Sequence, residues 1–191
     1  MSWLSKTSSL PHEKRDSLNT SREKPYGNWR VNRKMTPELA MEEEAKFPTM
    51  EYLNSGNFGV AYTLDHKVVK YTVDREEYIA ALKVLKNPVP CIATIFSAEQ
   101  LHDLNLYRIV VEKVKTLDHD ERKIISYLRD KIKDKDFYFW KDEFKHPIAK
   151  QYITMLKCLE AHGYSIGDAH KKNIGYNKKG RLVLFDLGLA L

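Results

Sequence analysis

The chain has 191 residues, a formal net charge of +6 and a 42% share of hydrophobic residues. That share is enough to bury the core of one domain. No apolar run reaches membrane-spanning length and no signal-peptide core is present, so we expect a soluble cytoplasmic protein that does not enter a membrane. The only cysteines, Cys91 and Cys158, predict neither a disulfide framework nor a zinc site, and we expect both to be reduced.

Residues 1–34 differ from the rest of the chain in composition, being rich in Ser, Asn, Lys and Arg and lacking hydrophobic periodicity. Eight Lys or Arg against three Asp or Glu give this segment +5 of the chain's +6. We predict a flexible basic arm. Its charge and its interleaved aromatics, Trp3, Tyr26 and Trp29, suit contact with nucleic acid or an acidic protein, and the alternative is a solvated tail.

The next segments predict a helix and then a strand, a turn and a second strand. Thr36-Pro37-Glu38 is typical of a helix N-terminus, and this helix should run to about Lys46. Residues 53–62 read Leu-Asn-Ser-Gly-Asn-Phe-Gly-Val-Ala-Tyr. The two glycines of this stretch let the backbone approach phosphate oxygens, and turn amides can point at an anion.

A β-branched strand over 67–73 carries Lys70, and a helix is expected over about 74–86. Glu77, or its neighbour Glu76, has two possible roles. It could form an ion pair with Lys70, or it could cap its own helix, because Asp74 and Glu77 form an Asp-x-x-Glu pattern. The sequence does not decide between these two roles.

Further along the chain, residues 106–114 predict an apolar strand, and helices are expected over 118–133 and about 148–162. Between the two helices, residues 136–144 place five aromatic side chains in nine positions. Such a run is more often part of a core than a site, and if exposed it would mark a protein interface.

Residues 166–173 read Ile-Gly-Asp-Ala-His-Lys-Lys-Asn, and Asp186-Leu-Gly follows thirteen residues after Asn173. Transfer of a γ-phosphoryl group needs a carboxylate near the attacking hydroxyl and hard oxygen ligands for magnesium. Asp168, Asn173 and Asp186 carry such oxygens. The residues from 174 to 185 predict a hairpin, which would bring Asn173 and Asp186 to the same end of a small sheet.

In their order along residues 50–191, these segments resemble the eukaryotic-like protein kinase superfamily. The resemblance is strongest to the small early serine/threonine protein kinases of tailed bacteriophages, which share the nucleotide loop and an Asp-x-His-x-x-Asn loop. It implies an α+β fold of two lobes. Residues 35–114 would form an antiparallel sheet with one helix and a hinge, and residues 115–191 a truncated helical C-lobe that carries the catalytic and metal-binding loops.

The resemblance also implies ATP and Mg²⁺ as cofactors. Lys70 would hold the α- and β-phosphates, Val111 would be the gatekeeper, and Glu112 and Val114 would offer a backbone carbonyl and amide to adenine. Asn54 stands where the usual pattern has its first glycine, and asparagine tolerates unusual backbone angles. The residues implied to bind nucleotide are Asn54, Gly56, Phe58, Gly59, Lys70, Glu77, Val111, Glu112 and Val114.

The same resemblance implies catalytic roles for Asp168, His170 and Lys70, and metal ligation by Asn173 and Asp186. Asp168 would orient the attacking serine or threonine hydroxyl. His170 takes the place of a lysine that stabilises the moving phosphate in most such kinases. That task would fall to protonated His170, to Lys171 or to Lys172.

The function that the resemblance implies is ATP- and magnesium-dependent transfer of phosphate to serine or threonine of protein substrates, either bacterial host proteins in the host cytoplasm or phage proteins. The sequence stops five residues after Asp186, so we expect the C-lobe to be truncated. Two alternatives stay open: a pseudokinase that acts as a binding or inhibitory module, and a small-molecule kinase of the aminoglycoside type, which shares Gly167 before the Asp-x-His-x-x-Asn loop.

Overall fold

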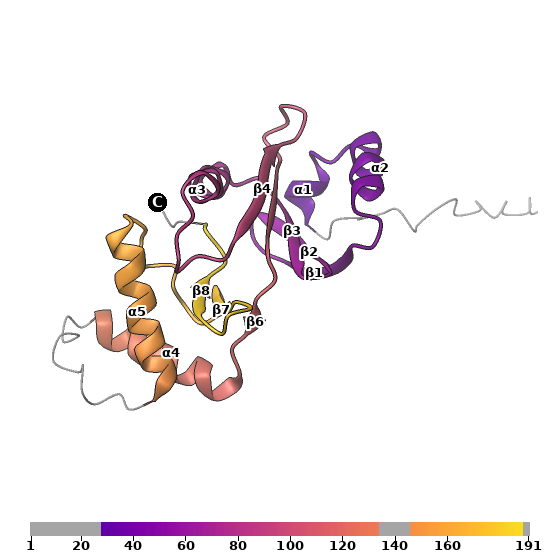
Figure 1. Ribbon diagram of the computed structural model, residues 1–191. Coiled ribbons are helices and arrows are strands. Elements are labelled where there is room, and N and C mark those ends of the chain that lie inside the picture. The colour runs from indigo at the N-terminus through magenta and orange to yellow at the C-terminus, as the bar shows by residue number, and fades with distance from the viewer. Residues whose placement is uncertain (1–27, 134–145, 189–191) are drawn as a thin grey trace, which may run out of the picture.

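The computed structural model describes residues 28–133 and 146–188, which form a mixed α+β structure (Figure 1). Its helices are α1 (Trp29–Asn32), α2 (Pro37–Lys46), α3 (Arg75–Lys86), α4 (His119–Lys133) and α5 (Pro147–Ala161). Its strands are β1 (Glu51–Ser55), β2 (Gly59–Leu64), β3 (Lys67–Thr72), β4 (Ile95–Gln100), β5 (Tyr107–Glu112), β6 (Lys115–Thr116), β7 (Ile174–Tyr176) and β8 (Leu182–Leu184). The expected α+β fold class is confirmed by this mixture of helices and strands.

The helices begin close to where the sequence predicts. Thr36 Oγ1 accepts a hydrogen bond from Leu39 N at 3.2 Å at the start of α2, and the Asp74 carboxylate caps α3. α4 and α5 begin within one residue of their expected starts. Within the described part of the chain, no helix combines the length and the apolar character that crossing a bilayer requires.

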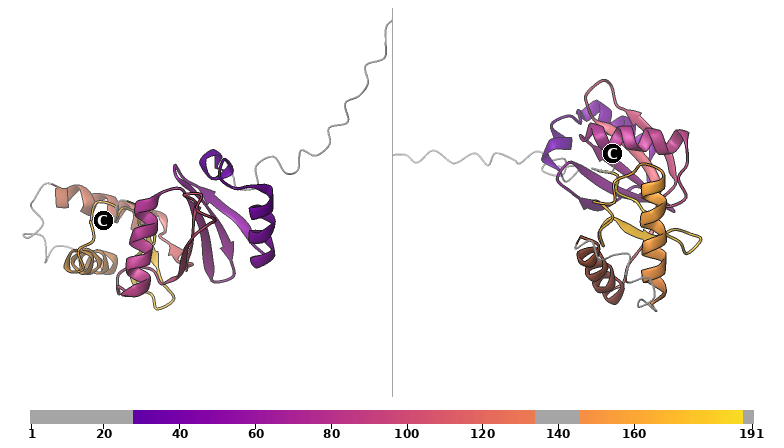
Figure 2. Two further views of the ribbon diagram at one scale, coloured as in Figure 1. Left: turned by 90° about the horizontal axis from the view of Figure 1, so that it is seen from above. Right: turned by 90° about the vertical axis from the view of Figure 1, so that its left-hand side faces the viewer.

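The larger sheet is antiparallel and has the strand order β1-β2-β3-β5-β4. Side chains alternate between its two faces. On β3, Val68 packs with the cluster that includes α3, whereas Val69 and Tyr71 pack with the cluster that includes α1 and α2. The helices therefore cover opposite faces of the sheet, as the left view in Figure 2 shows, and Lys70 lies on the face covered by α3.

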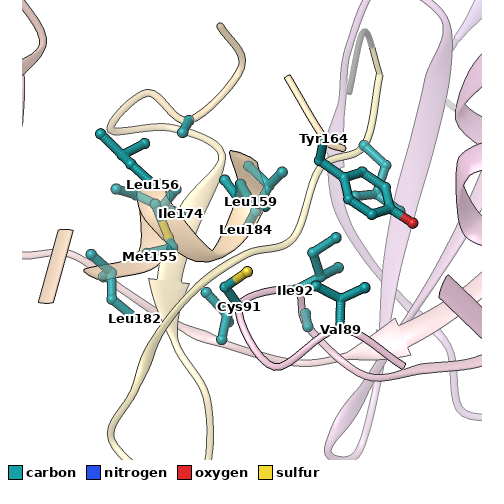
Figure 3. Close-up of a cluster of buried hydrophobic side chains, with 14 of the residues drawn as sticks. Val89, Cys91, Ile92, Met155, Leu156, Leu159, Tyr164, Ile174, Leu182 and Leu184 are labelled. Atoms are coloured by element: carbon teal, nitrogen blue, oxygen red, sulfur yellow. The ribbon is translucent and has the colours of Figure 1, made fainter. Parts of the chain in front are cut away.

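The second part of the structure consists of α4, α5 and the small sheet β6-β7-β8. Apolar residues of α5, β7 and β8 pack together with the segment that precedes β4 (Figure 3). Ala93 N donates to Leu184 O at 2.8 Å, and Leu184 N donates to Cys91 O at 2.9 Å. These bonds join the β7–β8 hairpin to the chain next to the large sheet, so one continuous core spans both parts.

The expected flexible arm over residues 1–34 extends too far at its C-terminal end. Residues 28–32 form a helix cap and the short helix α1, and Val31 is fully buried beside Met35 and Leu39. The sequence lacks the periodicity of a helix here because α1 spans a single turn and buries one apolar side chain. The earlier part of the arm, including Trp3 and Tyr26, lies outside the described residues, as does the whole aromatic run 136–144.

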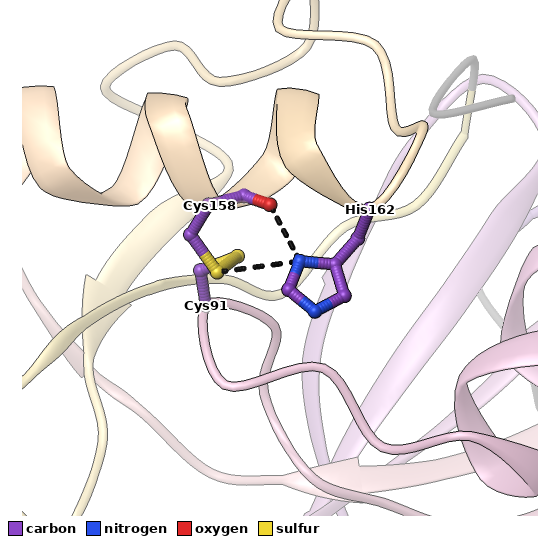
Figure 4. The surroundings of a disulfide bond; sticks show 3 residues. All are labelled: Cys91, Cys158 and His162. Atoms are coloured by element: carbon purple, nitrogen blue, oxygen red, sulfur yellow. Dashed lines mark hydrogen bonds between the residues drawn. A yellow bond between two sulfur atoms is a disulfide. The ribbon is translucent and has the colours of Figure 1, made fainter.

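Cys91 and Cys158 form a disulfide, contrary to the expectation that both are reduced (Figure 4). The bond joins the segment before β4 to α5 across 67 residues of sequence. His162 lies beside it, with Nδ1 at 2.8 Å from Cys158 O and 3.9 Å from Cys158 Sγ. Spacing alone could not reveal this pair, because the fold brings the two positions to a Cα–Cα distance of 6.1 Å.

Replacing Cys158 with serine will lower the free energy of unfolding by about 2–4 kcal/mol under oxidising conditions, because the loop that the disulfide closes is long. Urea unfolding with and without reductant measures the effect. Reductant should lower the stability of the wild-type protein to near that of the variant and leave the variant unchanged. A wild-type midpoint that reductant does not move would contradict the disulfide.

Candidate active site

The glycine turn, residues 55–59, joins β1 to β2 and is closed by a hydrogen bond from Gly56 N to Gly59 O at 2.9 Å. Gly59 is required by close packing, because a Cβ there would lie 2.6 Å from Tyr71 O. Gly56 faces open space, as suits an approach by a ligand. Asn54 lies within β1 and has no positive φ, so the tolerance of asparagine for unusual backbone angles is not used at this position.

Lys70 connects three segments of the chain: β3, α3 and the residues that follow β8. From β3, its Nζ donates to Glu77 Oε1 on α3 and to Asp186 Oδ1, the latter at 3.0 Å. The Glu77 side chain therefore forms the ion pair with Lys70. It does not cap its own helix, since Asp74 N instead donates to Thr72 Oγ1. The sequence left two roles open for Glu77, and in the structure its side chain forms the ion pair.

Charge holds Lys70 and Asp186 in their ionised forms, whereas burial outweighs the Lys70 ammonium at Glu77 and raises the pKa of that carboxyl. Burial by itself would lower the pKa of Lys70, but the carboxylates of Glu77 and Asp186 outweigh it and raise that pKa. Burial would likewise raise the pKa of Asp186, but the Lys70 ammonium outweighs it and lowers that pKa. Lys70 thus stays cationic and Asp186 stays anionic at neutral pH, as contact with phosphate and a metal ion requires.

The Asp168 loop, residues 166–173, is held by its own backbone. His170 N donates to Asp168 O at 2.7 Å, and Asn173 N donates to His170 O at 2.9 Å. Asp168 Oδ2 is buried and has no hydrogen-bond partner among the described residues. Burial, together with the negative charge of Asp186, raises the pKa of the Asp168 carboxyl. A buried carboxylate oxygen without a partner is costly, so this orphaned acceptor sets Asp168 apart from the paired acids of the site.

His170 is neutral in this arrangement. Its Nδ1 accepts a hydrogen bond from Lys172 N at 3.2 Å, so the proton of the ring lies on Nε2. Burial and the positive charge of Arg129 lower the pKa of His170. Of the three candidates for stabilising a moving phosphate, protonated His170 is therefore disfavoured, and the exposed side chains of Lys171 and Lys172 remain.

Asn173 and Asp186 lie on adjoining strand ends, as the predicted hairpin requires. Ile174 pairs with Leu184, and Phe185 N donates to Asn173 O at 2.9 Å. Across the described residues, no three His, Cys, Asp or Glu side chains group into a site that could hold a metal by themselves. Magnesium at nucleotide sites usually takes one or two protein ligands, and phosphate oxygens and water complete its shell. The pair Asn173 and Asp186 fits that smaller requirement.

The expected hinge ends β5 and contacts the small sheet. Val111 is buried in the core on the α3 side of the sheet. The Glu112 carboxylate accepts hydrogen bonds from Thr94 N, Thr94 Oγ1 and Lys178 N. A Cβ at Gly175 would lie 2.9 Å from Val114 Cγ2 and 2.7 Å from the backbone oxygen of Lys115. The hinge is therefore held by hydrogen bonds from Thr94 and from the β7–β8 turn to the Glu112 carboxylate, and by close packing against β7 at Gly175.

Two residues that the sequence did not single out hold the Asp168 loop from outside. Arg129 on α4 donates from Nη2 to Gly167 O at 2.8 Å. The buried hydroxyl of Tyr152 on α5 donates to Ala169 O at 2.7 Å. Both lie in helices whose pattern indicates only ordinary packing, and no sequence signal separates them from other helical residues.

The expected site residues thus fall into four groups, one of which is the loop that carries Asp168 and His170. The structure brings Lys70, Glu77 and Asp186 into direct contact, and places Asn173 one strand end away. Phe58 is half exposed at the tip of the glycine turn, and the hinge residues lie at the end of β5. A scan against protein-family models and a search of curated proteins both found no match for this chain.

Proposed function

We propose that this chain is a protein-kinase-like phosphotransferase that moves the γ-phosphoryl group of ATP to a serine or threonine hydroxyl of a protein. The observation that carries the proposal is the contact of Lys70 with both Glu77 and Asp186, the last of which is 116 residues away in sequence. Such a cation, held by two acids beside a glycine turn, suits nucleotide phosphates. The proposal includes a two-lobe arrangement with residues 35–114 in one lobe and 115–191 in the other.

Each group would then have one task. The backbone of the glycine turn and Lys70 would bind phosphate oxygens, and residues 112–114 would bind the base. Bound at Asn173 and Asp186, Mg²⁺ would supply neutralisation of the phosphate charge. The substrate hydroxyl oxygen would bond to the γ-phosphorus as the bond to the bridging oxygen breaks and ADP leaves. Asp168 would accept the hydroxyl proton.

The unpaired oxygen of Asp168 favours catalysis over a binding role alone. In a protein that only binds nucleotide, nothing requires a buried carboxylate oxygen to stay without a partner. Two other functions use the same groups: a nucleotide-dependent binding module, and a kinase that acts on a small cationic molecule. Turnover with protein substrates separates the proposal from both.

Binding of ATP, measured by calorimetry with and without magnesium, tests the first step. We expect binding that magnesium strengthens in the wild-type protein and that Asn173→Ala weakens mainly when magnesium is present. Asn177→Ala is a suitable control, because Asn177 lies in the turn of the same hairpin and caps only its own turn. An ATP affinity that is the same with and without magnesium, or no ATP binding at all, would contradict the assigned metal ligands.

Replacing Arg129 with alanine will move the acid limb of the kcat/KM profile to higher pH. The positive charge of Arg129 lowers the pKa of Asp168, although burial and Asp186 outweigh it. Its removal raises that pKa further. Asp168 must be ionised to accept a proton, so activity is then lost sooner as pH falls. Arg129→Lys keeps the charge and should shift the limb less, and equal profiles for all three proteins would contradict the role of Asp168 as base.

A further inference from the structure

The residues at the start of α1 contact the glycine turn at two points that the proposed mechanism does not use. Asn28 Nδ2 donates to Gly56 O at 2.6 Å and to Gly59 O at 3.3 Å. The Arg30 guanidinium lies over the ring of Phe58, 5.0 Å from its centre. Both ends of the turn and its aromatic tip are therefore held from one side by a segment far from them in sequence.

Asn28 is itself fixed to the protein core. Its Oδ1 accepts hydrogen bonds from Arg30 N at 2.9 Å and from Val31 N at 3.3 Å, which makes it the cap of α1. Val31 is fully buried, and Asn28 is only 6% exposed. The side chain thus uses its oxygen to hold α1 and its amide group to hold the turn. A residue that merely capped a helix would need only the oxygen.

The contact fixes the direction of the peptide groups in the turn. The carbonyl and N–H of a trans peptide point in opposite directions. With Gly56 O held against Asn28, the N–H of Asn57 must point away from Asn28. Other hydrogen bonds hold the turn through Gly56 N and Phe58 O, whereas the carbonyl of Gly56 is held by Asn28. Binding of phosphate by backbone amides is tighter when their directions are set before the ligand arrives.

We propose that Asn28 is a positioning residue that holds the glycine turn in the shape that binds nucleotide phosphates. This inference rests on the proposed function and adds to it a residue that lies outside the expected nucleotide-binding set. Asn28 does not touch the nucleotide; it acts through the turn. Its loss should therefore weaken binding of the phosphates and leave binding of the base unchanged.

The test compares the affinities of magnesium ATP and of adenosine, which lacks phosphates, for wild type and Asn28→Ser. Serine can still cap α1 through its hydroxyl, but it has no amide to donate to the turn. We expect the Kd for ATP to rise about fivefold to tenfold, given what hydrogen bonds of this kind contribute. The Kd for adenosine should stay the same, and exchange of the Gly56 N–H should become faster.

Thr36→Ala is the matched control, because it removes a helix cap in the same region without touching the glycine turn. It should lower thermal stability and leave the ratio of the two affinities unchanged. An equal rise in both Kd values for Asn28→Ser, or no rise in either, would overturn the positioning role of Asn28 and leave the proposed function standing. Failure of the wild-type protein to bind ATP would instead overturn the proposed function, and the inference with it.

Discussion

Replacing Asp186 with asparagine will lower the rate of phosphoryl transfer at least about 100-fold, while the protein remains folded. The two side chains have nearly the same shape, so packing is preserved. The charge is lost, however, and with it the ion pair to Lys70 at 3.0 Å and the carboxylate ligand proposed for magnesium. Single-turnover kinetics with a protein substrate measures the loss.

Asp120→Asn is the control for that change. Asp120 is a highly exposed acid on α4 whose ion-pair partner is Lys123, and surface pairs of this kind contribute little. Its replacement should leave transfer unchanged. If Asp186→Asn transfers phosphate as fast as Asp120→Asn does, Asp186 has no role in the chemistry.

Replacing Lys70 with alanine will have an effect of similar size, about 100-fold or more on kcat/KM. Lys70 is proposed to hold the α- and β-phosphates, and its loss also leaves the buried Glu77 facing Asp186 without a cation between them. Glu77→Gln keeps a hydrogen-bond acceptor near Lys70 and loses only the charge. We expect a smaller loss for it, on the order of tenfold.

Lys67→Ala is the matched control for Lys70. It lies on the same strand, but its ammonium group lies over the ring of Phe96 at 4.9 Å, away from both acids. Steady-state kinetics should show near wild-type values for this variant. Equal losses in the two lysine variants would point to damage of β3, and would remove the argument that Lys70 acts on the nucleotide.

Local patterns in the sequence predict the elements that position the candidate site. The β-branched run around Lys70 predicts β3, and the glycine-bearing turn between 174 and 185 predicts the β7–β8 hairpin. These signals are local: backbone preference and alternation determine them within a few residues. The contact between Lys70 and Asp186 was not predicted: the family resemblance implied only that both residues serve a nucleotide site, and the structure adds the direct ion pair between them.

What the sequence could not predict depends on contacts between distant segments. Three contacts illustrate this: the disulfide, the hydrogen bond from Asn28 to Gly56 and the hydrogen bond from Arg129 to Gly167. Each joins two parts of the chain, and the local sequence of either part gives no sign of the other. Asn28 illustrates the reason. It reads as one more polar residue of a basic segment, and only the fold places Gly56 O within reach of its amide.

The most direct test of phosphoryl transfer is the movement of label from ATP labelled at the γ-phosphate. Purified wild-type protein, the Asp186→Asn variant and the Asp120→Asn control are each incubated with magnesium and a bacterial lysate from which endogenous kinases have been inactivated. The proposal predicts label on serine or threonine of protein with the wild type and the control, and little with Asp186→Asn. Tight ATP binding by the wild type without any transfer of label would contradict it, and would assign the site to a nucleotide-binding module.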